Sequence, residues 1–270
     1  MDRYAVLGNP INHSRSPFIH TMFAESTAQN MEYGRLFCPL GEFVKTVDDF
    51  RANGGKGLNI TVPFKEQAHA YATMLSDRAR RAGAVNTLKF NDDGTVYGDN
   101  TDGAGFIFDI KRAGWDFTGR RILVLGAGGA SRGILGGILD EKPLSVLLVN
   151  RTVEKAVVLQ QEFGGIEVCS FEDLNCRSDR FEFIINATSL SLNSKLPAIA
   201  DGLYKDARVY DLMYGSSSST VFTEHAVKYG AEEAMDGLGM LVGQAAVSFE
   251  IWRGVTPEPQ PVLDALRQQL

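Results

Sequence analysis

The sequence has few cysteines, and their spacing is irregular. Its 270 residues include three, Cys38, Cys169 and Cys176. Disulfide frameworks and zinc sites require regularly spaced sets of such ligands, so neither is expected here. The four histidines have no metal-ligand spacing either, and we predict that no metal is bound. A chain of this length can bury a sizeable hydrophobic core, and we expect it to fold in a reducing compartment.

The sequence also lacks a long apolar run and a surplus of positive charge. No apolar stretch approaches the roughly 20 residues that a membrane helix requires. The 27 Lys and Arg residues are outnumbered by 33 Asp and Glu residues, and the formal net charge is -6. Nucleic-acid and membrane partners are therefore not expected. Residues 1–8 predict a short strand and a turn rather than an export signal, which favours a cytoplasmic location.

Strand-like and helix-like segments alternate along most of the chain, which is typical of an α/β protein with mainly parallel sheets. In the first part, strands are predicted at 3–7, 33–38 and 57–60, and helices at 17–29 and 42–53. A hairpin is predicted from 87–90 and 95–97, joined by Asn91-Asp92-Asp93-Gly94. The polar, glycine-rich stretch 98–103 follows, and we place a domain boundary there.

A second strand series begins at residue 121. Its predicted strands are 121–125, 145–149, 167–169, 183–185 and 208–210, and its predicted helices are 130–140, 153–163 and 220–229. This order predicts a doubly wound dinucleotide-binding domain. Two last helices, predicted at 237–252 and 259–270, are expected to return to the first domain. The predicted domains are therefore residues 1–101 with 237–270, and residues 102–236, with a cleft between them.

A glycine-rich loop stands in the position that a dinucleotide fingerprint requires. Gly126-Ala127-Gly128-Gly129-Ala130 follows an apolar run and precedes a helical pattern. The first glycine permits a tight turn, the second lets the backbone approach a pyrophosphate, and the helix start presents free N–H groups. Ser131 stands where many such sites have Gly or Ala, so the match is incomplete.

The end of the next predicted strand indicates which dinucleotide is bound. An NAD site usually has Asp or Glu at this place, against the ribose 2′-hydroxyl. Here Asn150-Arg151-Thr152 follow the strand, and Lys155 lies one helical turn beyond Arg151. A guanidinium group, a hydroxyl and an ammonium group suit a 2′-phosphate, so NADP is predicted in preference to NAD. The alternative is that Arg151 and Lys155 are only solvated charges.

A polar stretch at the end of the third predicted strand contains the candidate catalyst. Hydride transfer to a ketone leaves an alkoxide that must be protonated, and the reverse reaction needs a base. Lys65, in Asn59-Ile60-Thr61-Val62-Pro63-Phe64-Lys65, is the candidate, with Asp102 as its partner. Taken alone, a lysine at such a place is more often a surface charge.

Several blocks of sequence resemble the successive motifs of the shikimate dehydrogenase family. They are His13-Ser14-Arg15-Ser16-Pro17, residues 59–65, Gly83-Ala84-Val85-Asn86-Thr87, Gly98-Asp99-Asn100-Thr101-Asp102-Gly103 and Asp236-Gly237-Leu238-Gly239-Met240-Leu241. With the glycine loop, Asn150-Arg151-Thr152 and Asn186-Ala187-Thr188-Ser189, they span nearly the whole chain in the family's order. The resemblance implies an enzyme of aromatic amino acid (chorismate) biosynthesis that reversibly reduces 3-dehydroshikimate to shikimate with NADPH.

The resemblance also implies the site residues. Lys65 and Asp102 would form the acid–base pair. The implied substrate contacts are Ser14, Ser16, Asn59, Thr61, Asn86, Tyr214 and Gln244. The implied cofactor contacts are Gly126, Ala127, Gly128, Gly129, Ala130, Asn150, Arg151, Thr152 and Lys155, with Asp77, Thr188, Met213 and Gly237. The first domain would then bind substrate, and the second, Rossmann-like domain would bind NADP.

Three departures from the family pattern are present: the first puts the selectivity for NADP in doubt, and the other two put substrate affinity and turnover in doubt. Lys155 stands where the family often has Arg, and a point charge replaces a planar fork. The segment Gly215-Ser216-Ser217-Ser218-Ser219 is a serine-rich loop next to Tyr214 and is expected to be flexible. Ser191 stands where Gly is frequent, and its β-carbon is expected to alter the approach of the nicotinamide loop.

Two other functions compete with this interpretation. One is a quinate/shikimate dehydrogenase or a related paralogue that uses NAD or works slowly, against which Arg151 and Thr152 argue. The other is a non-catalytic nucleotide-binding module, and the presence of both Lys65 and Asp102 argues against it. Both a monomer and a homodimer remain open.

Overall fold

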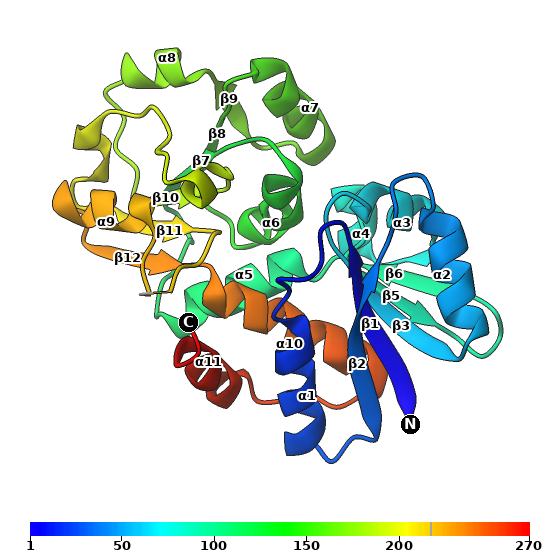
Figure 1. Ribbon diagram of the computed structural model, residues 1–270. Helices are drawn as coiled ribbons and strands as arrows, with labels where there is room; N and C mark the ends of the chain where they lie inside the picture. Colours follow the sequence, from blue (N-terminus) through cyan, green and yellow to red (C-terminus); the bar gives the residue numbers. More distant parts are fainter. Residues whose placement is uncertain (217) are drawn as a thin grey trace. The chain divides into compact units, whose positions relative to one another are not determined.

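The chain divides into two compact units. The computed structural model describes residues 1–216 and 218–270, and Ser217 of the serine-rich loop lies outside the described residues (Figure 1). The first unit is Met1–Gly105 with Val242–Leu266, and the second is Phe106–Leu241 with Arg267–Leu270. The chain passes between the units at three places, and each falls inside a helix: α5 (Asp102–Arg112), α10 (Leu238–Arg253) or α11 (Pro259–Arg267).

The first unit is built on a mixed sheet with the strand order β2-β1-β3-β5-β6-β4. Its strands are β1 (Asp2–Gly8), β2 (Met31–Phe37), β3 (Gly55–Ile60), β4 (Met74–Leu75), β5 (Thr87–Phe90) and β6 (Val96–Asp99). β1 pairs in parallel with β2 and β3, whereas β5 is antiparallel to both β3 and β6. The predicted hairpin supplies the antiparallel part, so this sheet is less parallel than the sequence indicated.

Helices cover both faces of the first sheet. They are α1 (Ser16–Ser26), α2 (Phe43–Ala52), α3 (Lys65–Tyr71), α4 (Asp77–Ala82) and part of α10. On one face, Phe43 and Phe64 stack at 5.6 Å within a buried apolar cluster that includes Leu58. On the other face, Trp252 of α10 packs on Tyr4 at 4.7 Å and donates a hydrogen bond to the Leu88 carbonyl. The carboxyl ends of β1 and β3 therefore emerge from a rigid, two-sided core.

The second unit has a wholly parallel sheet with the order β12-β11-β10-β7-β8-β9. Its strands are β7 (Arg121–Leu125), β8 (Ser145–Val149), β9 (Glu167–Cys169), β10 (Phe183–Asn186), β11 (Arg208–Asp211) and β12 (Glu233–Asp236). Its helices are α6 (Gly129–Asp140), α7 (Val153–Phe163), α8 (Phe171–Asn175), α9 (Val221–Lys228) and the short 3-10 turns η1 (Leu190–Asn193) and η2 (Asp201–Tyr204). Strand order reverses at β7, the position where such sheets bind nucleotides.

Two buried clusters hold this second sheet between layers of helices. Ile134 of α6 and Leu159 of α7 belong to one cluster, and Leu174 of α8 and Phe222 of α9 belong to the other. The α/β fold class predicted from the sequence is confirmed. The last helix of the chain is α11 (Pro259–Arg267).

Several short elements were not predicted. α3, α4, α8, β4 and β12 are short or strongly polar, so they lack a clear apolar period. The polar stretch 98–103 lies at the ends of two elements: Gly98 and Asp99 end β6, and Asp102 begins α5. Gly105 is required within α5 because a β-carbon there would overlap the backbone of Gln244. The predicted bounds of the two domains stay a prediction.

Candidate active site

Lys65 and Asp102 are in direct contact in the first unit. Lys65 is the first residue of α3 and Asp102 the first residue of α5. The Lys65 Nζ donates to Asp102 Oδ2 at 2.5 Å, and the two side chains are 25% and 11% exposed. The pair is therefore largely shielded from water while the ammonium group keeps an accessible side.

Asn86 holds the second oxygen of the Asp102 carboxylate. Its Nδ2 donates to Asp102 Oδ1 at 2.8 Å and to Thr101 Oγ1 at 2.9 Å. Its Oδ1 accepts from the Thr101 N–H and the Thr87 hydroxyl, both at 2.9 Å. A longer contact of 3.5 Å joins Asn86 Nδ2 to Gln244 Oε1. The Asn86 amide therefore has one fixed orientation, which fixes the carboxylate in turn.

Asn59 uses its amide inside the protein. Its Oδ1 accepts from the Tyr33 hydroxyl at 2.6 Å and from His20 Nε2 at 3.1 Å. Its Nδ2 donates to Ser248 Oγ at 3.0 Å and to Thr87 Oγ1 at 3.2 Å. With 6% of its surface exposed, Asn59 braces the neighbouring site residues. Its predicted contact with substrate is untested.

His20 is a buried, neutral member of this cluster. Its ring stacks on Tyr33 at 4.2 Å, and burial lowers the pKa of His20 from 6.5 to about 3. The hydrogen bond to Asn59 opposes this shift, but it does not outweigh the loss of solvent. The ring therefore carries no charge at neutral pH, and its Nε2 donates to the Asn59 carbonyl oxygen.

Ser14 and Ser16 lie in the loop that leads into α1. Ser16, the first residue of α1, is buried, and its N–H donates to Ser14 Oγ at 3.3 Å. Arg35 of β2 donates from Nη2 and Nε to the Ser14 carbonyl, at 2.6 and 3.2 Å. The Thr61 N–H donates to the Leu7 carbonyl at 2.9 Å, at the carboxyl end of neighbouring β1. Arg35 was missed from the sequence because an exposed arginine carries no motif.

The glycine loop of the second unit is held by a side chain that the sequence also singled out. Gly126 has φ +102°, and Gly128 is the N-cap of α6. Asn150 Oδ1 accepts from the Ala127 N–H at 3.1 Å, and its Nδ2 donates to the Thr152 carbonyl at 2.7 Å. Asn150 therefore links the glycine loop after β7 to the segment after β8.

Ser131 departs from the usual fingerprint, and the structure supplies its reason. The residue is fully buried, and its hydroxyl donates to the Gly126 carbonyl. The serine thus holds the loop from within the first turn of α6.

Beyond β8, Arg151, Thr152 and Lys155 are exposed at the start of α7, with Thr152 as its N-cap. Free N–H groups and two cations therefore lie at the carboxyl ends of adjacent strands, which fits a phosphate-bearing nucleotide.

Other predicted cofactor residues meet at the ends of β10, β11 and β12. A β-carbon on Gly126 would lie 3.0 Å from the Thr188 methyl group, so these two segments touch. The Gly237 N–H donates to the Met213 carbonyl at 2.9 Å, and a β-carbon on Gly237 would overlap the Leu212 carbonyl. The structure therefore brings these four predicted residues together as two contacting pairs, Gly126 with Thr188 and Met213 with Gly237.

Two predicted site residues, Asp77 and Tyr214, are less buried than the residues around Asp102. Asp77 begins α4 in the first unit, and its side chain is 96% exposed and paired with Arg80 at 2.5 Å. Tyr214 is half-buried beside the serine-rich loop. That loop is tied on both sides, because Gly215 N–H donates to Asp236 Oδ2 at 3.2 Å and the Ser219 hydroxyl donates to Glu224 Oε1 at 2.6 Å.

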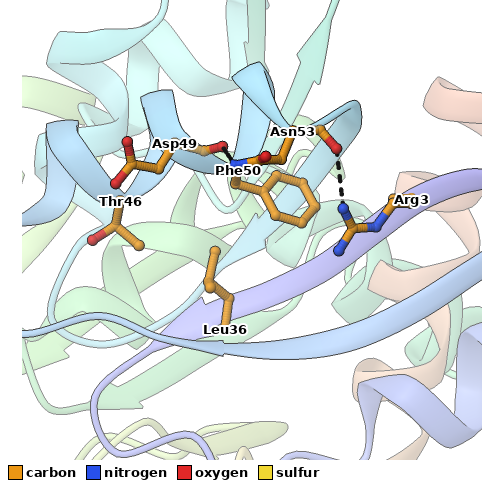
Figure 2. Close-up of a pocket in the computed structure, with 6 residues that line it drawn as sticks. All are labelled: Arg3, Leu36, Thr46, Asp49, Phe50 and Asn53. Carbon is orange, nitrogen blue, oxygen red and sulfur yellow. Dashed lines mark hydrogen bonds between the residues drawn. The ribbon is translucent and has the colours of Figure 1, made fainter.

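A separate pocket lies away from these residues. It has a volume of about 400 Å³ and is lined by Arg3, Leu36, Thr46, Asp49, Phe50 and Asn53 (Figure 2). Arg3 donates to the Asn53 carbonyl at 3.0 Å, near the amino ends of β1 and β3. Lys65 and Thr61 follow the carboxyl end of β3, where open α/β sheets bind ligands. The pocket contains none of the predicted site residues.

Comparison with known proteins decides the family. The family model described as shikimate dehydrogenase substrate binding domain matches residues 6–88. Those described as shikimate/quinate 5-dehydrogenase and shikimate 5'-dehydrogenase C-terminal domain match 110–205 and 237–267. The shikimate dehydrogenase (NADP(+)) of Aeromonas salmonicida is 51% identical over 100% of the chain and 99% of the relative. The chain belongs to the shikimate dehydrogenase family.

Further similar proteins match along the whole chain. The Cellvibrio japonicus shikimate dehydrogenase (NADP(+)) is 50% identical, covering 100% of this chain and 98% of its own. The crystal structure of an Ael1 enzyme from Pseudomonas putida matches with a TM-score of 0.92 and 42% identity over 98% of each chain. The Thermus thermophilus shikimate 5-dehydrogenase, in complex with NADP(H) and shikimate, matches with a TM-score of 0.87 and 34% identity over 100% of each chain.

These relatives confirm the expected activity, that of an NADP-dependent shikimate dehydrogenase of the shikimate pathway. The quinate- or NAD-using paralogue and the non-catalytic module are not favoured. Within residues 1–216 and 218–270, no helix is long and apolar enough to cross a membrane. In the same part of the chain, no three His, Cys, Asp or Glu side chains are grouped to hold a metal ion.

Proposed function

We propose that Lys65 and Asp102 are the acid–base pair with which this enzyme interconverts 3-dehydroshikimate and shikimate. The observation that carries the proposal is the 2.5 Å contact between Lys65 Nζ and Asp102 Oδ2, with the other carboxylate oxygen held by Asn86. A proton-transfer group needs a fixed direction and a restricted approach of water, and the pair has both.

The proton moves through Lys65. In the reductive direction its ammonium group protonates the oxygen that gains negative charge, and in the oxidative direction its amine takes the proton of the substrate hydroxyl. Asp102 orients the lysine and stabilises its charged form, while Asn86 prevents the carboxylate from turning away. When bound, NADPH supplies the hydride and NADP⁺ accepts it in the opposite direction.

The predicted substrate contacts would bind the carboxylate and the hydroxyl groups of the substrate. Ser14 and Ser16 offer hydroxyl groups for a carboxylate, from a loop fixed by Arg35. Thr61, Asn86, Gln244 and Tyr214 would bind the hydroxyl groups. Asn59 would act mainly by bracing Asn86 and Thr87.

The second unit fits NADP. The pyrophosphate would lie against the N-terminus of α6 at Gly126–Ala130, which Asn150 holds open. Arg151, Thr152 and Lys155 would bind the 2′-phosphate. Thr188, Met213 and Gly237 would surround the nicotinamide end, and Asp77 would add a weaker contact.

The proposal also covers the domain bounds, the cellular location and the oligomeric state. The substrate domain is residues 1–101 with 237–270, and the NADP domain is residues 102–236, which the compact units support to within a few residues. The enzyme works in the cytoplasm, in keeping with three free cysteines. It acts as a monomer or homodimer on a small-molecule substrate, without nucleic acid or membrane.

The test is the initial rate at which reduced nicotinamide cofactor forms from shikimate and from quinate, each with NADP and with NAD. We expect NADP-dependent oxidation of shikimate, reduced about 10²- to 10⁴-fold in Lys65→Ala. Lys56→Ala is the matched control, because Lys56 is a lysine of the same strand region paired with exposed Asp92 at 3.1 Å. Full activity in Lys65→Ala, or equal losses in both variants, would contradict the proposal.

A further inference from the structure

Asp211 is a fully buried carboxylate at the end of β11. Its Oδ1 accepts from Asn186 Nδ2 and from the Met213 N–H, both at 3.1 Å. Its Oδ2 accepts from the hydroxyls of Ser191 and Thr220, both at 2.6 Å. All four donors are uncharged groups, so the carboxylate depends on hydrogen bonds for its solvation.

The donors come from separate segments of the second unit. Ser191 lies in η1, Met213 follows β11, and Thr220 is the N-cap of α9. Asn186 joins the first two segments, because its Nδ2 also lies 3.3 Å from Ser191 Oγ and its Oδ1 accepts from the Thr188 hydroxyl at 2.6 Å. One carboxylate therefore connects the loop 188–193 to Met213.

Burial and hydrogen bonds have opposite effects on the Asp211 carboxylate, so each hydrogen-bond donor contributes to keeping it charged. Burial raises the pKa of Asp211 above its ordinary value, and the hydrogen bonds from Ser191, Thr220, Met213 and Asn186 oppose that rise. Removing a hydrogen-bond donor costs more free energy when the charged acceptor is buried than when it lies at the surface. A glycine at position 191 would supply no donor, although the family pattern often has glycine there.

We infer that Ser191 is a positioning residue for the cofactor: its hydroxyl fastens the loop 188–193 to Asp211 and so fixes Thr188 relative to Met213. The inference rests on the proposed function in one respect, the placement of the nicotinamide end between Thr188 and Met213. It reverses the expectation that the β-carbon at this position disturbs the nicotinamide loop, since the same side chain adds a hydrogen bond of 2.6 Å.

The experiment compares Ser191→Ala, Ser191→Gly and Ser191→Thr with the unaltered enzyme. The dissociation constant of NADP is measured by fluorescence titration without substrate, and KM for each substrate and kcat are measured with shikimate. Ser189→Ala is the control, because Ser189 is exposed in the same loop and its side chain makes no capping hydrogen bond.

We expect Ser191→Ala and Ser191→Gly to weaken NADP binding about three- to tenfold, the range for the net contribution of one typical hydrogen bond. Turnover should fall as well, while KM for shikimate stays within about twofold. Ser191→Thr keeps the hydroxyl and should restore NADP binding, and Ser189→Ala should match the unaltered enzyme. A role in stability alone would not separate KM for NADP from KM for shikimate.

Unchanged or tighter NADP binding in Ser191→Ala and Ser191→Gly would overturn the inference, as would a Ser191→Thr variant as weak as Ser191→Ala. Failure of the proposed function looks different. It would appear as absent turnover of shikimate in the unaltered enzyme, whereas NADP binding without substrate still tests Ser191.

Discussion

Asn59 and Ser248 meet in the interior of the first unit, 189 positions apart in the sequence. Asn59 Nδ2 donates to Ser248 Oγ at 3.0 Å. The Ser248 hydroxyl is also 2.7 Å from Thr87 Oγ1 and 3.3 Å from Thr101 Oγ1. Because Thr87 and Thr101 hold the Asn86 amide, this buried serine of α10 supports the proposed catalytic pair.

Replacing Ser248 by alanine should therefore impair catalysis without touching the cofactor site. We expect the free energy of unfolding to fall by about 1–3 kcal/mol, because buried polar groups lose a partner, and kcat to fall about fivefold. Urea titration and steady-state rates measure the two effects. An unchanged kcat with reduced stability would show that Ser248 is structural only.

Asp102→Asn should remove the charge that orients Lys65 while preserving the size of the side chain at position 102. We expect kcat to fall about 10²-fold or more, the range for a displaced acid–base group, with KM for NADP unchanged. Asp92→Asn is the matched control, since Asp92 also pairs with a lysine but is 94% exposed. A kcat near that of the unaltered enzyme would remove Asp102 from the mechanism.

Arg35→Gln should loosen the Ser14 loop. The variant loses the two-point hold on the Ser14 carbonyl and a positive charge beside the proposed carboxylate site. We expect KM for shikimate to rise about threefold, with kcat and KM for NADP little changed, as for the loss of one partly exposed hydrogen-bonding group. Arg3→Gln, on the neighbouring strand, should behave like the unaltered enzyme, and an equal effect from it would refute the local explanation.

Arg151→Leu should alter the choice of cofactor. Removing the guanidinium group is expected to raise KM for NADP about 10- to 100-fold and to leave KM for NAD nearly unchanged, given the strength of charge-assisted hydrogen bonds to phosphate. Conversely, Lys155→Arg should increase the preference for NADP, because a planar fork replaces a point charge. Parallel loss of activity with both cofactors in Arg151→Leu would argue against a 2′-phosphate contact.

His20 makes stability depend on pH in a defined direction. Its pKa is about 3 in the folded chain and 6.5 when unfolded, so only the unfolded chain gains a proton between these values. Its contribution is complete above pH 6.5 and is lost as pH falls, at up to about 1.4 kcal/mol per pH unit. Between pH 6.5 and 5 the loss should reach about 2 kcal/mol.

The variant His20→Gln has no titrating ring and should lose that part of the acid dependence. Urea unfolding at pH 7.5 and pH 5 gives the comparison. If both proteins lose the same stability over this interval, His20 is not the group responsible.

Much of the second unit was predictable because its pattern is local. The strands at 121–125 and 145–149 and the helix at 153–163 were predicted with the bounds that the structure has, since buried parallel strands are continuous apolar runs between clear turns. α3, α4 and α5 were missed because their residues are polar or glycine-rich and gain stability from tertiary packing.

The site divides in the same way. Residues with a distinctive chemistry, such as Lys65, Asp102 and Arg151, could be nominated from the sequence, and their roles are predictions that the contacts support. Ser248 and Arg35 could not be nominated, because a serine or an exposed arginine has no sequence signal of its own. Their importance comes only from what they contact.

The sequence by itself determined the family, the α/β class, the place of the glycine loop and the chemical types available for proton transfer, because these follow from residue identity and short-range spacing. Only the tertiary structure decided which of those groups touch: the contact of Lys65 with Asp102, the contact of Ser248 with Thr87, and the sharing of Asp211 by Ser191 and Met213. Hydrogen bonds act over about 3 Å, and only folding brings residues this distant in sequence within that range.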